Sequence, residues 1–118
     1  MTVSAYMKKV NAAKIDDDLV AKIAKAYNTK LPELVEKLIT VSGTGEFVAR
    51  YRFLSYSDIY YAEEDLGISL RKKKIVPIAD CGDNDFLVFN AADDVWQMYN
   101  IVDEVGFSKT RELTDLLK

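Results

Sequence analysis

The side chains that could carry out chemistry are mostly carboxylates, because the chain of 118 residues has no histidine and a single cysteine. Without an imidazole, the sequence excludes a His-based triad, a Cys–His nucleophile and an HExxH zinc site. Adjacent acids such as Glu63-Glu64 and Asp93-Asp94 could in principle act as an acid and a base. Neighbouring side chains on a helix or strand point in different directions, so this adjacency favours a solvated surface. We therefore expect a protein that is not an enzyme.

The acidic segment at residues 80–85 resembles a calcium loop only in composition. An EF-hand needs glycine at the sixth position and an acid at the twelfth, whereas here glycine is third and the twelfth residue is Ala91. Asp, Asn and Gly suit a turn between two strands, and we expect no metal and no cofactor. Cys81 has no neighbouring base, and the acids beside it would raise its pKa, which predicts an inert thiol.

Charge is unevenly distributed along the chain, although the net charge is only −3. Residues 1–79 carry 13 Lys and Arg against 10 Asp and Glu, and residues 80–118 carry 3 against 9. An acidic C-terminal third disfavours nucleic acid and suits a basic protein partner. The basic run at residues 71–74 could contact phosphate, but such a run is usually a solvated turn that protects an edge strand. We expect a protein partner and no nucleic acid.

The N-terminal residues lack the apolar core of a signal peptide, and no stretch of 18 uncharged apolar residues occurs in the chain. A single thiol and no export signal predict a cytoplasmic protein that does not cross a membrane. The oligomeric state is not predicted.

The elements that must position these residues begin with helices. Val3, Tyr6, Met7 and Val10 have helical spacing, and residues 1–15 are expected to form an N-terminal extension. Residues 16–18 predict the start of a helix that ends near Tyr27. Thr29 is predicted to cap the next helix, with Pro32 in its first turn and Gly43 at its end. Residues 42–45 read as a turn.

The hydrophobic period then changes to that of strands. Strands are predicted at 47–54, 75–79, 86–89 and 95–99, and Ile101, Val102 and Val105 could extend this meander. A short helix capped by Ser57-Asp58 is expected to end at Gly67, and Pro77 marks an edge or the entry of its strand. Ser108 is predicted to cap a final helix with Leu113, Leu116 and Leu117 on its apolar face. This order predicts one α+β domain over residues 1–118, with helices packed on one side of an antiparallel sheet.

Several of these segments resemble the SUKH superfamily. Ile75 to Phe89 is similar to its central hairpin, in which a VPIA-like strand, a Gly/Asp turn and a second strand lead to an aromatic residue. Lys30-Leu31-Pro32-Glu33 with its helix, and Phe53-Leu54 ahead of Ser57-Asp58-Ile59, resemble two further family segments. The likeness covers residues 16–118. The acidic–aromatic signature of the best-known branch is absent near residues 45–55.

The resemblance implies a strongly twisted antiparallel sheet and no catalytic residues. Family members include yeast regulators of cell-wall synthesis and bacterial immunity proteins that bind and block toxins, often nucleases. We therefore expect a non-catalytic protein-binding domain, an immunity protein that neutralises a cognate toxin domain. A regulatory or scaffold module of the cell-wall type is the alternative, and a small enzyme using two converging carboxylates is the third hypothesis.

The candidate partner-binding residues come from the acidic C-terminal third. The acids would steer and orient a basic toxin. The indole ring of Trp96 would anchor the toxin if it is exposed, and would belong to the core if it is buried. These candidates are Asp83, Asp85, Asp93, Asp94, Trp96, Asp103 and Glu104.

Overall fold

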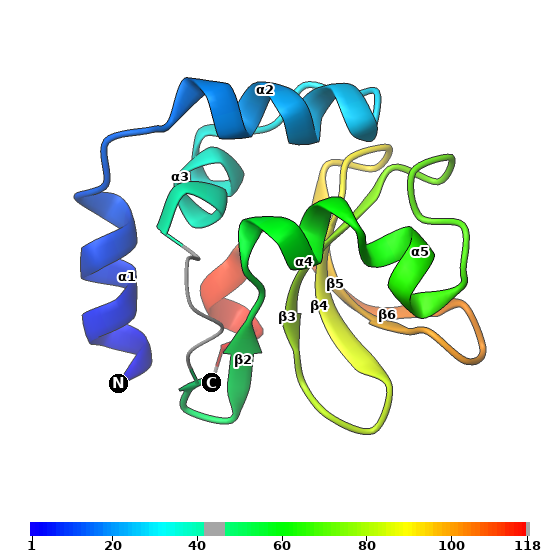
Figure 1. Ribbon diagram of the computed structural model, residues 1–118. Coiled ribbons are helices and arrows are strands. Elements are labelled where there is room, and N and C mark those ends of the chain that lie inside the picture. Colours follow the sequence, from blue (N-terminus) through cyan, green and yellow to red (C-terminus); the bar gives the residue numbers. More distant parts are fainter. Residues whose placement is uncertain (42–46, 118) are drawn as a thin grey trace.

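A computed structural model describes residues 1–41 and 47–117 of the chain (Figure 1). The described residues form an α+β domain with one core, which confirms the predicted fold class. The predicted turn at residues 42–45 lies outside the described residues. In chain order, the elements are α1 (Val3–Asn11), α2 (Asp17–Ala26), α3 (Glu33–Val41), β1 (Phe47–Val48), β2 (Tyr51–Phe53), α4 (Tyr56–Tyr60), α5 (Ala62–Leu66), β3 (Ile75–Asp80), β4 (Asp85–Asn90), β5 (Val95–Asn100), β6 (Val105–Thr110) and the 3₁₀ helix η1 (Leu113–Asp115).

The first three helices begin largely where their sequence indicates. Asp16 caps α2 by accepting a hydrogen bond from the Leu19 N–H, as predicted. The prediction that Thr29 caps α3 is wrong, because its hydroxyl donates to its neighbour's carbonyl, that of Lys30. Helix α1 buries Tyr6 and Val10 in the common core, so residues 1–15 contribute to the domain itself.

The predicted strand at residues 47–54 is instead a hairpin of β1 and β2. Val48 pairs with Tyr51 across a two-residue turn, and Ala49 in that turn has a φ of 54°. The helix that follows is divided into α4 and α5. Its cap is Ser55 and not Ser57, because the Ser55 hydroxyl accepts from the Asp58 N–H while the Asp58 carboxylate accepts from the Ser55 N–H. This reciprocal capping box fixes the start of α4.

The six strands form one antiparallel sheet in the order β1-β2-β3-β4-β5-β6. The consecutive strands β3, β4, β5 and β6 are joined by connections of four residues each. A residue with positive φ directly precedes each of the four strands: Lys74, Asn84, Asp94 and Glu104. This geometry is typical of hairpin loops that end in a left-handed residue. Pro77 is not on an edge strand, since β3 lies between β2 and β4, but the register with β4 shifts directly after its pair with Val88, and such irregularities are where sheets accommodate proline.

Elements cover both faces of the sheet. Cross-strand partners share a face, so the pairs Arg52–Asp80 and Asp80–Phe86 define one side, and α4 and α5 pack there. Phe53 lies on the opposite side, where its ring is 4.5 Å from that of Tyr6 in α1. The C-terminal segment covers the same side at Tyr51, whose hydroxyl donates to the Leu116 carbonyl at 2.6 Å.

The predicted final helix that begins at Ser108 is wrong. Residues 105–110 form β6, which pairs with β5, and Ser108 lies at a register shift with a φ of 56°. Only a 3₁₀ turn follows, and Leu113 within it and Leu117 after it are buried, as the apolar pattern anticipated. Pairing with β5 holds residues 105–110 in an extended conformation and satisfies their backbone groups across the sheet, so no helix begins at Ser108.

No helix within residues 1–41 and 47–117 has the length and apolar character needed to cross a bilayer.

Candidate functional site

The structure divides the six predicted acids between the two ends of the β3–β6 meander. Asp83 belongs to the β3–β4 connection and Asp85 is the first residue of β4, and both lie at the same end as Asp103 and Glu104 of the β5–β6 connection. The Asn100 side chain links the end of β5 to the start of β4 by donating to Asp85 at 2.9 Å. Asp93 and Asp94 lie in the β4–β5 connection at the opposite end. The structure therefore places four of the six acids at one end of the meander.

Several of these carboxylates already have partners within the chain. Glu104 is 3.3 Å from the Lys73 ammonium, and this hydrogen bond raises the pKa of Lys73. Asp93 accepts from Asn90 and lies 3.4 Å from the Lys109 ammonium.

Three other acids make no hydrogen bond or ion pair through their carboxylates within residues 1–41 and 47–117: Asp83, Asp94 and Asp103. Asp83 and Asp103 are therefore the carboxylates most available to a partner at the shared end.

Trp96 is a core residue. Its side chain is only 5% exposed, and its ring packs edge-on against Phe89 at 5.1 Å between centroids. The indole is therefore not a surface anchor. Of the two alternatives given from the sequence, an exposed anchor or a buried core residue, the structure shows the second.

The exposed apolar residues near the end of the meander that carries these four acids come from the β5–β6 hairpin. Val102, Val105 and Phe107 are 68%, 55% and 42% exposed. Val105 pairs with Asn100 and Phe107 with Met98, so both side chains lie on the sheet face that also carries Asp85. We call Val102, Val105 and Phe107, together with Asp83, Asp85 and Asp103, the hairpin face. Sequence reasoning included Val102 and Val105 in a possible extension of the meander but did not name them as binding residues, and it left Phe107 out because it expected a helix to begin at Ser108.

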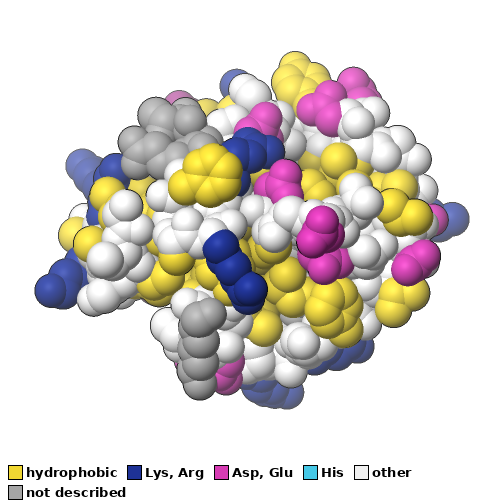
Figure 2. All heavy atoms as spheres, turned by 90° about the horizontal axis from the view of Figure 1, so that it is seen from below, with side chains coloured by type: hydrophobic (Ala, Val, Ile, Leu, Met, Phe, Trp, Pro, Cys, Tyr) yellow, Lys and Arg dark blue, Asp and Glu magenta, His cyan; other side chains and the backbone are white. Residues whose placement is uncertain are grey.

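A hollow of about 490 Å³ adjoins the hairpin face. Phe107 and Met98 form part of its wall, and three acids line it against one cation, Arg50. The acids are Asp83, Asp85 and Asp115. Figure 2 views the molecule from the end of the β3–β4 turn, and there hydrophobic side chains reach the surface between carboxylates. The hollow therefore combines apolar wall with excess negative charge.

Cys81 also lines this hollow but is poorly suited to act as a nucleophile. Burial raises the pKa of its thiol to about 11, and the neighbouring Asp80 and Asp85 charges act in the same direction. The sequence predicted the direction from the acids, whereas burial is the larger cause.

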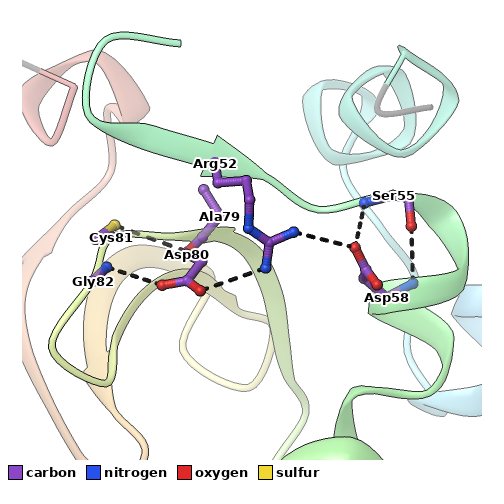
Figure 3. Close-up of polar contacts among 7 residues, drawn as sticks. All are labelled: Arg52, Ser55, Asp58, Ala79, Asp80, Cys81 and Gly82. Atoms are coloured by element: carbon purple, nitrogen blue, oxygen red, sulfur yellow. Dashed lines mark hydrogen bonds and ion pairs between the residues drawn. The ribbon is translucent and has the colours of Figure 1, made fainter. Parts of the chain in front are cut away.

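A second set of polar side chains links two strands to α4 (Figure 3). The guanidinium of Arg52 lies 3.6 Å from the Asp58 carboxylate and 3.5 Å from the Asp80 carboxylate. Asp80 also accepts from the Gly82 N–H at 2.9 Å, and Asp58 closes the capping box of α4 with Ser55. We call Arg52, Asp58 and Asp80 the Arg52 brace. Sequence reasoning missed it because its members are 28 residues apart at their widest and meet only through the β2–β3 pairing.

Carboxylates also converge at the Arg52 brace. Asp58, Asp80 and Asp65 line a hollow of about 150 Å³ with Leu54 and Phe86. Both brace carboxylates already accept backbone N–H bonds and face the same cation, which is an arrangement that fixes α4 against the sheet. No group of three or more His, Cys, Asp or Glu side chains suited to a metal ion occurs among the described residues.

Comparison with known proteins gives no match to a family model, to a curated protein or to a solved structure.

Proposed function

We propose that this chain is a non-catalytic protein-binding domain that docks its hairpin face onto a basic protein. The observation that carries the proposal is the exposure of Val105 and Phe107 on one sheet face, at the end of the meander where the connections carry Asp83 and Asp103. Exposed apolar residues with a polar rim are typical of protein interaction sites. An isolated hydrophobic pair on an edge strand contributes little to folding, so a partner explains it better.

The chemistry of the hairpin face supports a basic partner. Asp83 and Asp103 have no cation of this chain to neutralise them among the described residues, and the adjoining hollow has three acids and one arginine. Rim charges of this kind are each worth about 0–1 kcal/mol in affinity, and they act mainly by accelerating association. The proposed partner therefore presents lysine and arginine side chains around an apolar centre.

The identity of the partner rests on the resemblance to SUKH proteins. We propose a toxin domain, such as a basic nuclease, that the chain neutralises by covering it. A regulatory or scaffold role remains the alternative and would use the same surface for a host protein that is not toxic.

The experiment co-expresses the chain with each reading frame encoded beside its gene. The proposal expects one of these products to arrest growth alone and to be neutralised and co-purified with the chain. A Phe107→Ser variant should weaken that complex by at least about tenfold, because a central aromatic side chain carries much of the energy of such an interface. Phe47→Ser is the matched control, since Phe47 is an exposed phenylalanine on the other edge strand, β1.

Charge is tested separately on the same complex. Asp83→Asn combined with Asp103→Asn should lower the association rate and flatten its dependence on salt, with a small effect on dissociation. Neutralisation that survives Phe107→Ser and fails with Phe47→Ser would place the interface elsewhere. A bound partner that is not toxic would favour the regulatory alternative.

A further inference from the structure

The basic side chains at the junction of α2 and α4 gather around a hollow far from the hairpin face in the fold. The hollow has a volume of about 480 Å³ and is lined by Lys22, Lys25, Ala26, Tyr60 and Arg71. Its wall thus holds three cations and no carboxylate, in a chain whose net charge is negative. In Figure 1, α2 lies directly above α4, and the Tyr27 hydroxyl of the α2 end donates to the Ile59 carbonyl of α4 at 2.8 Å.

Arg71 is held in place by aromatic rings and one hydrogen bond. Its guanidinium carbon lies 5.1 Å from the centre of the Tyr60 ring and 6.0 Å from that of Tyr27. One terminal nitrogen donates to the Tyr60 carbonyl at 2.6 Å. Within the described part of the chain, no carboxylate pairs with this guanidinium, and its Nε has no hydrogen-bond partner. Because Nε is buried, the N–H groups that this oriented guanidinium can still offer to a ligand are those of its two terminal nitrogens.

The two lysines are as available as the arginine. Lys22 and Lys25 are exposed, three residues apart on one face of α2, and neither forms an ion pair with the described residues. The C-terminal end of α2 carries a partial negative charge of about half a unit, which Lys25 more than offsets. Glu63 accepts hydrogen bonds from the N–H groups of residues 70 and 71, which together with the Arg71 charge lower its pKa, so this carboxylate stays ionised and offsets one of the three cations. The hollow therefore keeps a net positive charge.

We propose that this hollow binds the phosphate group of a small phosphate monoester. A fixed planar guanidinium can bind two oxygens of a phosphate at once, and two mobile ammonium groups can neutralise the remaining charge. The volume exceeds that of the phosphate group alone and lies within the usual range for small-molecule sites, so an organic part of the ligand would contact Tyr60 and Ala26. The sequence had assigned residues 71–74 to a solvated turn, but Arg71 is half-buried and fixed.

The test uses phenyl phosphate, inorganic phosphate, sulfate and acetate as probes, with amide chemical shifts of the intact chain as the readout. Phenyl phosphate should bind most tightly and shift residues of α2, α4 and the segment at Arg71. Lys22→Glu combined with Lys25→Glu should weaken it by at least about tenfold, the loss expected for a charge-assisted hydrogen bond. Lys8→Glu with Lys9→Glu is the charge-matched control, because both lysines are exposed on α1, and it should bind like the wild type. Arg71→Lys keeps the charge but loses the planar fork, and it should bind several-fold more weakly while remaining folded.

Acidity gives an independent readout. The second pKa of a phosphate monoester is about 6, so affinity should fall between pH 7.5 and pH 5 as the ligand gains a proton. The chain contains no histidine that would change charge in this interval. If Lys8→Glu with Lys9→Glu weakens phenyl phosphate binding as much as Lys22→Glu with Lys25→Glu, the effect comes from net charge alone and the proposal is overturned. Equal binding of acetate and phenyl phosphate, or an affinity that does not change with pH, would also overturn it.

Discussion

Strands β4 and β6 have the same length and belong to the same sheet, but they serve the protein differently. Residues 86–90 of β4 are all buried, whereas β6 exposes most of its side chains, including Val105 and Phe107. β4 has a strand neighbour on each side, and β6 has β5 on one side only. Apolar residues are therefore explained by folding in β4. In β6 the apolar residues are exposed on an edge strand. Burial in the core does not explain them, whereas contact with a partner would.

The sharpest way to test this comparison is to shorten one side chain on each strand. Leu87→Ala should lower the free energy of unfolding by about 2–5 kcal/mol, because Leu87 is fully buried and its removal leaves a cavity. Phe107→Ala should change it by about 0.5 kcal/mol or less, as for most surface substitutions. Urea unfolding followed by circular dichroism measures both values.

The two variants also control each other. The Leu87 variant keeps the hairpin face intact, so any complex it forms at a temperature where it is folded should retain the wild-type affinity. A loss of stability from Phe107→Ala as large as that from Leu87→Ala would contradict the comparison and place Phe107 in the core.

The next effect concerns Cys81, which lies beside both regions in the β3–β4 connection. Burial raises the pKa of its thiol to about 11 from an ordinary value of 9.0, so at pH 8 the folded chain should hold about 100-fold less thiolate than the unfolded chain. Iodoacetamide should therefore react with Cys81 about 100-fold more slowly in the folded protein. The rate should go on rising between pH 9 and 11, where that of the urea-unfolded control levels off.

The same shift carries a consequence for stability. Above pH 9.0 the unfolded chain loses the thiol proton before the folded chain does, so the stability that this group contributes is present below pH 9.0 and is lost as the pH rises toward about 11. Cys81→Ala should remove this part of the alkaline loss. A reactive thiol at pH 8 would mean that the hollow beside Phe107 is more open than the structure describes.

The sequence predicted β4 and its partners well because their local patterns are strong. Phe86 to Phe89 is apolar on both faces, which indicates a central strand, and the adjoining Asp, Asn and Gly residues indicate turns. Asp16 likewise marked the start of α2 correctly. In each case a few neighbouring residues are sufficient to determine the element.

The errors lie where distant pairing decides the structure. Leu113, Leu116 and Leu117 are spaced as in a helix, but pairing with β5 holds residues 105–110 extended, and Leu113 lies in a 3₁₀ turn. The Arg52 brace depends on β2–β3 pairing that no local pattern encodes. The hairpin face was predicted only in part. Its acids could be named from the acidic composition of residues 80–118, whereas its exposed apolar residues are recognised only once the position of β6 at the edge of the sheet is known.

The smallest expected effect tests how β6 is joined to the fold. Gly106 pairs with Tyr99, and a Cβ added to it would meet the side-chain amide of Gln97. Gln97 is buried, and its Oε1 lies 3.4 Å from the Asn90 amide nitrogen, so it cannot move aside without losing that contact. Gly106→Ala should therefore cost about 1–3 kcal/mol, a typical penalty for overpacking and for a disturbed buried polar pair.

A double-mutant cycle separates the clash with Gln97 from any other destabilisation that alanine causes at residue 106. In a Gln97→Ala background the added methyl group has room, and Gly106→Ala should then cost at least about 1 kcal/mol less than in the wild type. Val105→Ala, at the neighbouring exposed position, should cost about 0.5 kcal/mol or less in either background. If Gly106→Ala costs the same with and without the Gln97 amide, β6 is not anchored through this contact. The exposure of the β6 side chains would then require that β6 packs against the sheet differently from β4 along its whole length.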